Sequence, residues 1–143
     1  MTKNYKTIQL DPKYAPKKTE KYMSEEQKAY FYALLTARRN EVIAAVDNGM
    51  SELSSSINID SMDGPDDEAD NASTTQRADI QMKILDRDKN LLAKIDNALD
   101  RLEKGSYGYS VISGDEIGLK RMLASPFATM TVEEKEEQEK KEF

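Results

Sequence analysis

The sequence predicts a mainly α-helical fold: a long antiparallel coiled-coil hairpin, a small globular head and a short C-terminal helix. Residues 31–53 and 80–102 each repeat apolar side chains at alternating steps of four and three, which is typical of coiled-coil helices. The chain is 34% charged and only 38% apolar, a composition that suits helices burying one seam and leaving their outer faces to water. Residues 40–76 contain no lysine or arginine but nine carboxylates, and we expect the hairpin to turn within this acidic stretch.

The composition excludes several classes of function. With 143 residues, the chain has room for one domain and a small appendage. It contains no cysteine and no histidine, which excludes thiol nucleophiles, thiolate metal sites and the commonest general base, so we expect no enzymatic activity. The net charge of -6 argues against direct binding to DNA or RNA and favours a basic protein cavity as the partner. No apolar run resembles a signal peptide or a membrane span, so we expect a cytoplasmic protein without membrane association.

The first two segments are an N-terminal arm, residues 1–22, and the hairpin, residues 23–104. The arm is rich in Lys, Tyr and Pro without periodicity, and we expect it to be partly ordered at best, with Ile8, Leu10 and Tyr14 available for packing. Ser24 and Gln27 form a capping box, in which the Ser24 hydroxyl accepts from the Gln27 N–H while the Gln27 side chain reaches back. The first helix is therefore predicted to begin here.

The hairpin carries two predicted seams joined by an acidic tip. The first seam consists of Phe31, Leu35, Arg38, Val42, Ala45, Gly49 and Leu53, with Leu34, Val46 and Met50 beside it. Gly64-Pro65 and clustered Ser, Asp and Asn then oppose a continuous helix, which places the tip at about residues 56–76. The second seam consists of Ile80, Ile84, Arg87, Leu91, Ile95, Ala98 and Leu102. It ends at Lys104-Gly105, a positively charged last turn with a glycine cap.

Residues 105–130 change in character and predict the head. Alternating apolar residues precede a Ser-Gly-Asp turn, which predicts a short β-hairpin, and a helical turn then ends at Pro126. In residues 131–143, a second capping box formed by Thr131 and Glu134 opens a short, highly charged helix.

Several motifs together resemble the DksA/TraR family of bacterial transcription regulators. They are the helix start YMSEEQ, a tip with Asp-x-x-Asp followed by Ala, and RDKNLLAKIDNAL in the second helix. The entry to the head, GSYGY, and its body, SGDEIGLKRMLASP, complete the set, which covers about four fifths of the chain. The resemblance implies a coiled-coil hairpin with a zinc-finger-like head that enters the secondary channel of RNA polymerase.

The resemblance also implies residue roles. The tip residues in contact with polymerase fall on Asp67, Asp70 and Ala72, and the polymerase-binding arginine of the coiled coil falls on Arg87. The ppGpp interface falls on Leu91, Lys94 and Lys135. The arginine expected before the head proline is Ser125 here, a departure that bears on the response to ppGpp.

The zinc-binding positions of the family depart most. Two CxxC pairs fall on Ser110, Ser113, Thr131 and Glu134. Hydroxyls and one carboxylate are a poor zinc set, so we expect no zinc and no other stably bound cofactor. Caps and hydrogen bonds from these four residues would replace the metal, together with an apolar core of Ile112, Ile117, Leu119, Met122, Leu123 and Phe127.

The leading hypothesis is a non-enzymatic, monomeric transcription factor that modulates the stability of promoter open complexes. Ribosomal RNA promoters, the stringent response and ppGpp enter through the resemblance. One rival is a Gre-like transcript-cleavage factor, in which tip carboxylates hold a catalytic magnesium ion of the polymerase. Another is a structural coiled-coil adaptor whose Asp67 and Asp70 form only a solvated acidic turn. An intermolecular four-helix pairing is the alternative to a monomer.

Overall fold

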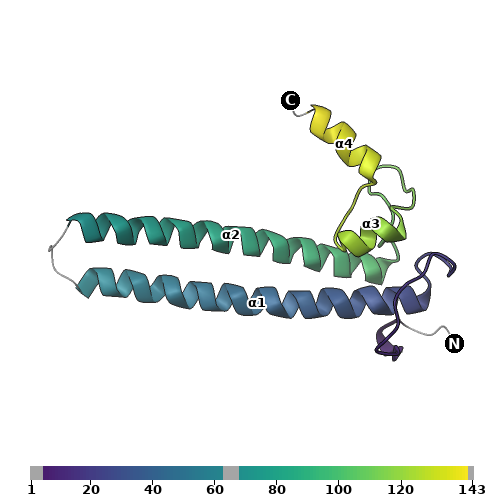
Figure 1. Ribbon diagram of the computed structural model, residues 1–143, viewed down its shortest axis with the longest axis horizontal. Coiled ribbons are helices and arrows are strands. Elements are labelled where there is room, and N and C mark those ends of the chain that lie inside the picture. Colours follow the sequence, from purple (N-terminus) through teal and green to yellow (C-terminus); the bar gives the residue numbers. More distant parts are fainter. Residues whose placement is uncertain (1–4, 63–67, 142–143) are drawn as a thin grey trace. The chain divides into compact units, whose positions relative to one another are not determined.

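A computed structural model describes residues 5–62 and 68–141, except the side chains of residues 56–62, 68–71 and 74. Its elements are a 3-10 turn η1 (Tyr5–Thr7) and four α-helices, α1 (Glu25–Met62), α2 (Glu68–Lys104), α3 (Leu119–Ala124) and α4 (Val132–Lys141) (Figure 1). The chain divides into two compact units. The tip unit is Arg39–Ala93, and the base unit combines Met1–Arg38 with Lys94–Phe143. In each unit, a segment of α1 lies antiparallel beside a segment of α2, which confirms the helical hairpin.

The helix ends agree closely with their sequence signals. The Gln27 N–H donates to the Ser24 hydroxyl at 3.3 Å, and α1 begins at the next residue after Ser24. The return bond of the predicted capping box is shifted, because the Gln27 side-chain oxygen accepts from the Met23 N–H at 2.9 Å. Helix α2 ends at Lys104, as predicted, and Gly105 follows with φ of 83°, a left-handed conformation that favours glycine.

Both long helices continue further toward the turn than the sequence suggested. Helix α1 runs through the Ser- and Asn-rich segment to Met62, and α2 already begins at Glu68. Each Ser, Asn or Asp costs a helix only a few tenths of a kcal/mol, about 0.7 at most, and extending an existing helix needs no new nucleus. The predicted turn residues Gly64-Pro65 lie outside the described residues.

In the tip unit, the residues of α2 that face α1 lie one position further along the chain than the sequence predicted. Val42, Val46 and Leu85 are buried, whereas the predicted seam positions Ala45, Ile80, Ile84 and Arg87 are exposed. Arg38, at the end of the base-unit segment of α1, is exposed as well. On α2 the inward positions are Ala78, Gln81, Leu85, Asp88 and Leu92, at alternating steps of three and four.

Gly49 explains this choice of register. A Cβ atom built on Gly49 would lie 2.9 Å from both Leu85 Cδ2 and Gln81 Nε2, so the two helices are in close contact here. Because Ile84 and Leu85 are adjacent and both apolar, the sequence allows either to face α1. The absent side chain at position 49 makes the space that Leu85 fills.

The base unit contains the main core. Phe31 and Leu35 of α1 and Ile95 and Leu102 of α2 are all at most 2% exposed. In the head, Ile117, Leu119 and Met122 are buried as predicted. The other predicted core residues are not: Ile112 and Leu123 are exposed, and Phe127 is half-buried. Tyr107, 3% exposed and tilted against Phe31 at 5.5 Å, takes part in the core instead.

The head is held together by loops rather than by strands. The predicted β-hairpin is reduced to one antiparallel bridge between Tyr109 and Glu116 in the described residues. Arg101 near the end of α2 reaches into this region, where its Nη2 donates to the carbonyls of Ser106 at 2.9 Å and Tyr109 at 2.5 Å. Helix α3 then ends before Pro126, as predicted.

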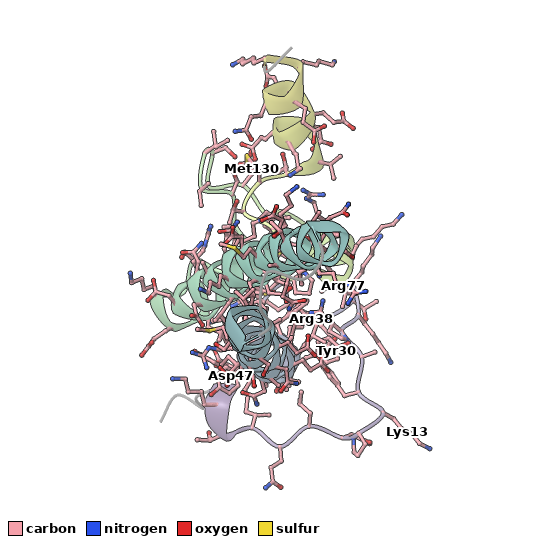
Figure 2. All side chains as sticks on the ribbon, turned by 90° about the vertical axis from the view of Figure 1, so that its left-hand side faces the viewer. Lys13, Tyr30, Arg38, Asp47, Arg77 and Met130 are labelled. Carbon is pink, nitrogen blue, oxygen red and sulfur yellow. The ribbon has the colours of Figure 1, made fainter. Side chains whose placement is uncertain are left out.

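The N-terminal arm packs against the base unit through tyrosines. Tyr5 meets Tyr32 and Tyr14 meets Tyr30, edge to face, at centroid distances of 5.5 and 6.3 Å. Figure 2 shows the arm looping outward at Lys13. The arm is thus more extensively packed than its sequence suggested, because its apolar contacts are made by rings spaced without helical or strand periodicity.

Tyr22 fastens the end of the arm to the head. Its hydroxyl donates to the Gly108 carbonyl at 2.6 Å and accepts from the Gly118 N–H at 3.1 Å, while its ring meets Tyr109 edge to face. Gly108 has φ of 88°, and a Cβ there would lie within 3 Å of both Tyr22 and Met23. Glycine is therefore required at this contact for both conformation and space.

Candidate functional site

The sequence-predicted tip residues occupy the beginning of α2. Asp67 lies outside the described residues. Asp70 falls in the first turn of α2 (Glu68–Lys104), although its side chain is not described. Carboxylates in the first turn are favourable because the free N–H groups of a helix give its N-terminus a partial positive charge. Ala72, two residues after Asp70 in α2, is exposed.

Arg87 is directed outward from the tip unit. Its side chain is 76% exposed, and its Nη2 lies 3.5 Å from the Asp88 carboxylate. An exposed pair at this distance contributes little stability, at most about 1 kcal/mol. The guanidinium of Arg87 is therefore accessible to a partner, and it is Asp88, 13% exposed, that lies toward the seam. Leu91, one turn further along α2, is half-buried.

A cationic pocket of about 370 Å³ lies in the base unit. Three cations line it from three helices: Lys94 of α2, Arg121 of α3 and Lys135 of α4. The remaining lining residues are neutral: Asn97, Ser125, Phe127, Ala128, Thr129 and Met130. No carboxylate belongs to this lining, so the pocket suits an anion that carries several phosphates. The family resemblance had assigned Lys94 and Lys135 to one ligand site, and both line this pocket.

Arg121 is the pocket residue that the sequence analysis missed. Its Nε donates to the Met130 carbonyl at 3.0 Å, which fixes the guanidinium plane beside the pocket. Ser125, where an arginine was expected, is the C-cap residue of α3, and its N–H donates to the Arg121 carbonyl at 2.7 Å. Because Arg121 and Ser125 both line the pocket, Arg121 supplies a cation close to the position where the expected one is absent. The short separation of the two residues was already visible in LKRMLAS.

The four positions related to zinc ligands form a hydrogen-bonded cluster. The Ser110 hydroxyl accepts from the Ile112 and Ser113 N–H groups at 3.0 and 3.2 Å. Thr131 and Glu134 form the predicted capping box at the start of α4: the Glu134 N–H donates to the Thr131 hydroxyl at 3.2 Å, and the Thr131 N–H donates to the Glu134 carboxylate at 2.9 Å.

The Glu134 carboxylate joins the two halves of this cluster. The Ser110 hydroxyl, the Thr131 N–H and the hydroxyls of Thr131 and Ser113 lower the pKa of Glu134 from 4.5 to about 2. This donor set does not suit zinc, because neutral hydroxyls are weak ligands and those of Ser110 and Thr131 already accept from backbone N–H groups. The cluster can instead connect the turn after Tyr109 to α4 without a metal.

Within residues 5–62 and 68–141, the described acidic side chains form no group of three that could hold a metal ion. None of the helices described is long and apolar enough to cross a lipid bilayer.

Comparisons with known proteins give one consistent result. The family model for the N-terminal domain of DnaK suppressor protein DksA matches residues 27–102. The RNA polymerase-binding transcription factor DksA of Caulobacter vibrioides is 36% identical over 129 residues, which cover 90% of this chain and 87% of that protein. The DksA of Escherichia coli strain K12 is 30% identical over 120 residues, 84% of this chain and 76% of the other. The solved structure of transcription factor DksA2 from Pseudomonas aeruginosa superimposes with a TM-score of 0.74 at 42% identity, covering 85% and 89% of the two chains.

Proposed function

The chain belongs to the DksA family, and from this premise we propose that it is a transcription factor that binds RNA polymerase and alters the stability of promoter open complexes. The proposal is supported most directly by relatives named RNA polymerase-binding transcription factors that match along 84% or more of this chain. The protein acts in the cytoplasm as a monomer, binds no DNA directly and catalyses no reaction. A net charge of -6 is consistent with a basic protein cavity as its target.

The acidic tip is the proposed effector. Asp67 and Asp70, with Ala72, enter the secondary channel and perturb mobile elements near the polymerase active site. Two like charges brought into a confined cavity gain strongly from a cationic partner there. Because the mobile elements change the surroundings of the tip, the binding free energy of the two carboxylates differs between polymerase conformations. A difference of this kind is what shifts an equilibrium between open and closed complexes. Arg87 contributes a separate contact on the polymerase surface.

The cationic pocket is the proposed site for ppGpp at the interface with polymerase. Lys94, Arg121 and Lys135 can each donate to phosphate oxygens, while Phe127 and Met130 offer apolar surface to the base. Leu91 is also assigned to this interface, although it belongs to the tip unit. Arg121 offsets the loss of the expected arginine at Ser125, so we expect ppGpp to enhance the activity.

The head is proposed to fold without zinc or any other stably bound cofactor. The support is the hydrogen-bonded cluster of Ser110, Ser113, Thr131 and Glu134, in which each side chain already has a protein partner. Chelator treatment should therefore leave the thermal unfolding curve of the protein unchanged.

Single-round transcription from a ribosomal RNA promoter with the cognate polymerase tests the function. The wild-type protein should inhibit, more strongly with ppGpp, and Asp70→Asn should lose inhibition while still binding polymerase. Asp79→Asn is the matched control, because Asp79 is an exposed aspartate of α2 beyond the tip. Magnesium-dependent RNA cleavage in stalled complexes would instead establish the Gre-like activity, and equal effects of wild type and Asp70→Asn would support the adaptor.

A further inference from the structure

Helix α3 is a short element that carries one of the three cations of the cationic pocket. It spans Leu119–Ala124, and a helix of six residues is not stable by itself. Packing holds it on the core, because Leu119 is 8% exposed and Met122 is completely buried. Arg121, between these two in sequence, lines the pocket. The place of the Arg121 guanidinium therefore depends on how the two ends of α3 are held.

Two tyrosine hydroxyls hold these ends. Gly118, the N-cap residue of α3, has no side chain that could bond to the helix, and its N–H donates to the Tyr22 hydroxyl at 3.1 Å. Its carbonyl accepts the first bond of the helix, from the Met122 N–H at 3.0 Å. Beyond the other end, the Tyr107 hydroxyl donates to the Pro126 carbonyl at 2.6 Å.

The two tyrosines differ in origin. Tyr107 belongs to the head, whereas Tyr22 belongs to the N-terminal arm and lies 96 residues before Gly118 in the sequence. None of the described residues that line the cationic pocket comes from the arm. Tyr22 instead lines a second cavity of about 230 Å³, together with Gly118 and Leu119 among others. An effect of Tyr22 on the cationic pocket must therefore pass through α3.

The cationic pocket depends on the exact place of Arg121. Lys94 and Lys135 come from two other helices, so the three cations converge only while α3 keeps its position. Arginine binds phosphate best with two parallel N–H groups, which requires a fixed orientation of the guanidinium plane. The bond from Arg121 Nε to the Met130 carbonyl at 3.0 Å provides part of this orientation. Binding groups generally have to be held within about 0.5 Å of their productive position.

We propose that Tyr22 is a positioning residue for the cationic pocket. By holding the N-cap residue of α3, its hydroxyl fixes the place of Arg121 among the three cations. The inference rests on the proposed function, in which this pocket binds ppGpp, and adds that the N-terminal arm sets the affinity for the nucleotide. Because coupling between two sites is reciprocal, bound ppGpp should in turn increase the protection of the Gly118 amide against hydrogen exchange.

The first test is the affinity of ppGpp for the complex of this protein with cognate polymerase. Tyr22→Phe should weaken ppGpp binding about 3- to 5-fold, while the affinity for polymerase without ppGpp stays unchanged. Tyr14→Phe is the matched control, because it removes another arm hydroxyl whose bond, to Glu20 at 2.8 Å, lies within the arm itself. The measurement is made at a temperature where every variant is fully folded, so that a loss of stability alone leaves the affinity unchanged.

A double-mutant cycle shows whether Tyr22 acts through Arg121. Arg121→Gln alone should weaken ppGpp binding about 10-fold. If the Tyr22 hydroxyl acts by placing the guanidinium, Tyr22→Phe added to Arg121→Gln should weaken binding by less than about twofold more. Independent effects would multiply to about 30- to 50-fold and would refute the positioning role.

NMR of the Arg121 Nε–H group tests the same coupling in the free protein. Exchange of this proton with water should be faster in Tyr22→Phe than in wild type or Tyr14→Phe, because its bond to the Met130 carbonyl is held less firmly.

The outcomes separate this inference from the proposed function. If the wild-type complex binds ppGpp no better than polymerase alone, the proposed nucleotide site fails, and the positioning role fails with it. If the wild-type complex binds ppGpp and Tyr22→Phe binds it equally tightly, only the positioning role is refuted. Unchanged exchange of the Arg121 Nε–H in Tyr22→Phe would also refute the positioning role alone.

Discussion

The contact of Tyr22 with the head provides a quantitative test of how the head is stabilised. The substitution Tyr22→Phe keeps the ring and its edge-to-face contact with Tyr109 but removes two hydrogen bonds. The N–H of half-buried Gly118 loses its acceptor at 3.1 Å, whereas the carbonyl of buried Gly108 loses the bond at 2.6 Å but still accepts from the Ile117 N–H at 2.9 Å. Each lost hydrogen bond costs about 1 kcal/mol net, and a backbone group left without a partner costs about 1–3 kcal/mol.

We therefore expect Tyr22→Phe to lower the free energy of unfolding of the base unit by about 2 kcal/mol. For a unit of about 90 residues, that corresponds to a fall in Tm of about 8–16 °C. Hydrogen exchange offers a local measurement, because the Gly118 amide donates to the Tyr22 hydroxyl. Its protection factor should fall about 30-fold, the equivalent of 2 kcal/mol.

Tyr32→Phe is the matched control. Tyr32 is half-buried and packs edge to face against Tyr5, yet its hydroxyl has no hydrogen-bond partner among the described residues. This variant should retain the wild-type Tm. An unchanged Tm together with unchanged protection of the Gly118 amide in Tyr22→Phe would show that the arm does not fasten the head, and the reasoning would be wrong.

Three further predictions follow from individual residues. The pKa of Glu134 is about 2 in the folded protein and 4.5 otherwise, so its stabilising effect is present above pH 4.5 and is lost as the pH falls toward 2. Glu134→Gln should therefore reduce the loss of stability in acid, which unfolding curves measured between pH 4.5 and 2 would show. Gly49→Leu should overlap with Leu85 and lower the free energy of unfolding, measured in denaturant titrations, by about 1–3 kcal/mol. Gly49→Ala should be close to neutral, because a gain of about 1 kcal/mol in helix propensity offsets the cost of the close contact made by the added Cβ. Arg121→Gln should weaken ppGpp binding to the polymerase complex about 10-fold in a nucleotide-binding assay, while Ser125→Ala should change it by less than about twofold.

The sequence predicted those parts of the fold that depend on local chemistry. Ser24, Gly105 and Thr131 lie at the predicted helix boundaries, because a cap depends on the few residues around it. The packing of the head was predicted less well. Ile112 is exposed and Tyr107 is buried, since burial there depends on where loops of irregular conformation come together, which no periodicity indicates.

The residues of the candidate site were also predicted only in part. Lys94 and Lys135 were assigned to one ligand site through the family resemblance, and both line the cationic pocket. Arg121 was missed because the comparison was made position by position, whereas the pocket can receive a cation from either of two positions one turn apart. Tyr22 was missed because its partners are backbone groups of two glycines more than 80 residues away, and backbone partners leave no side-chain signature in a sequence.

The error in the second seam has a physical reason. The periodicity through Ile80, Ile84, Arg87 and Leu91 is real, but an adjacent set of inward positions, Gln81, Leu85, Asp88 and Leu92, faces α1. An isolated hairpin needs only one such stripe, and the one it uses includes a glutamine and an aspartate while two isoleucines remain exposed. Packing within the hairpin alone would favour the more apolar stripe. Close approach at Gly49 favours the less apolar register, and this leaves Ile80, Ile84 and Arg87 exposed on the opposite side of the helix contact.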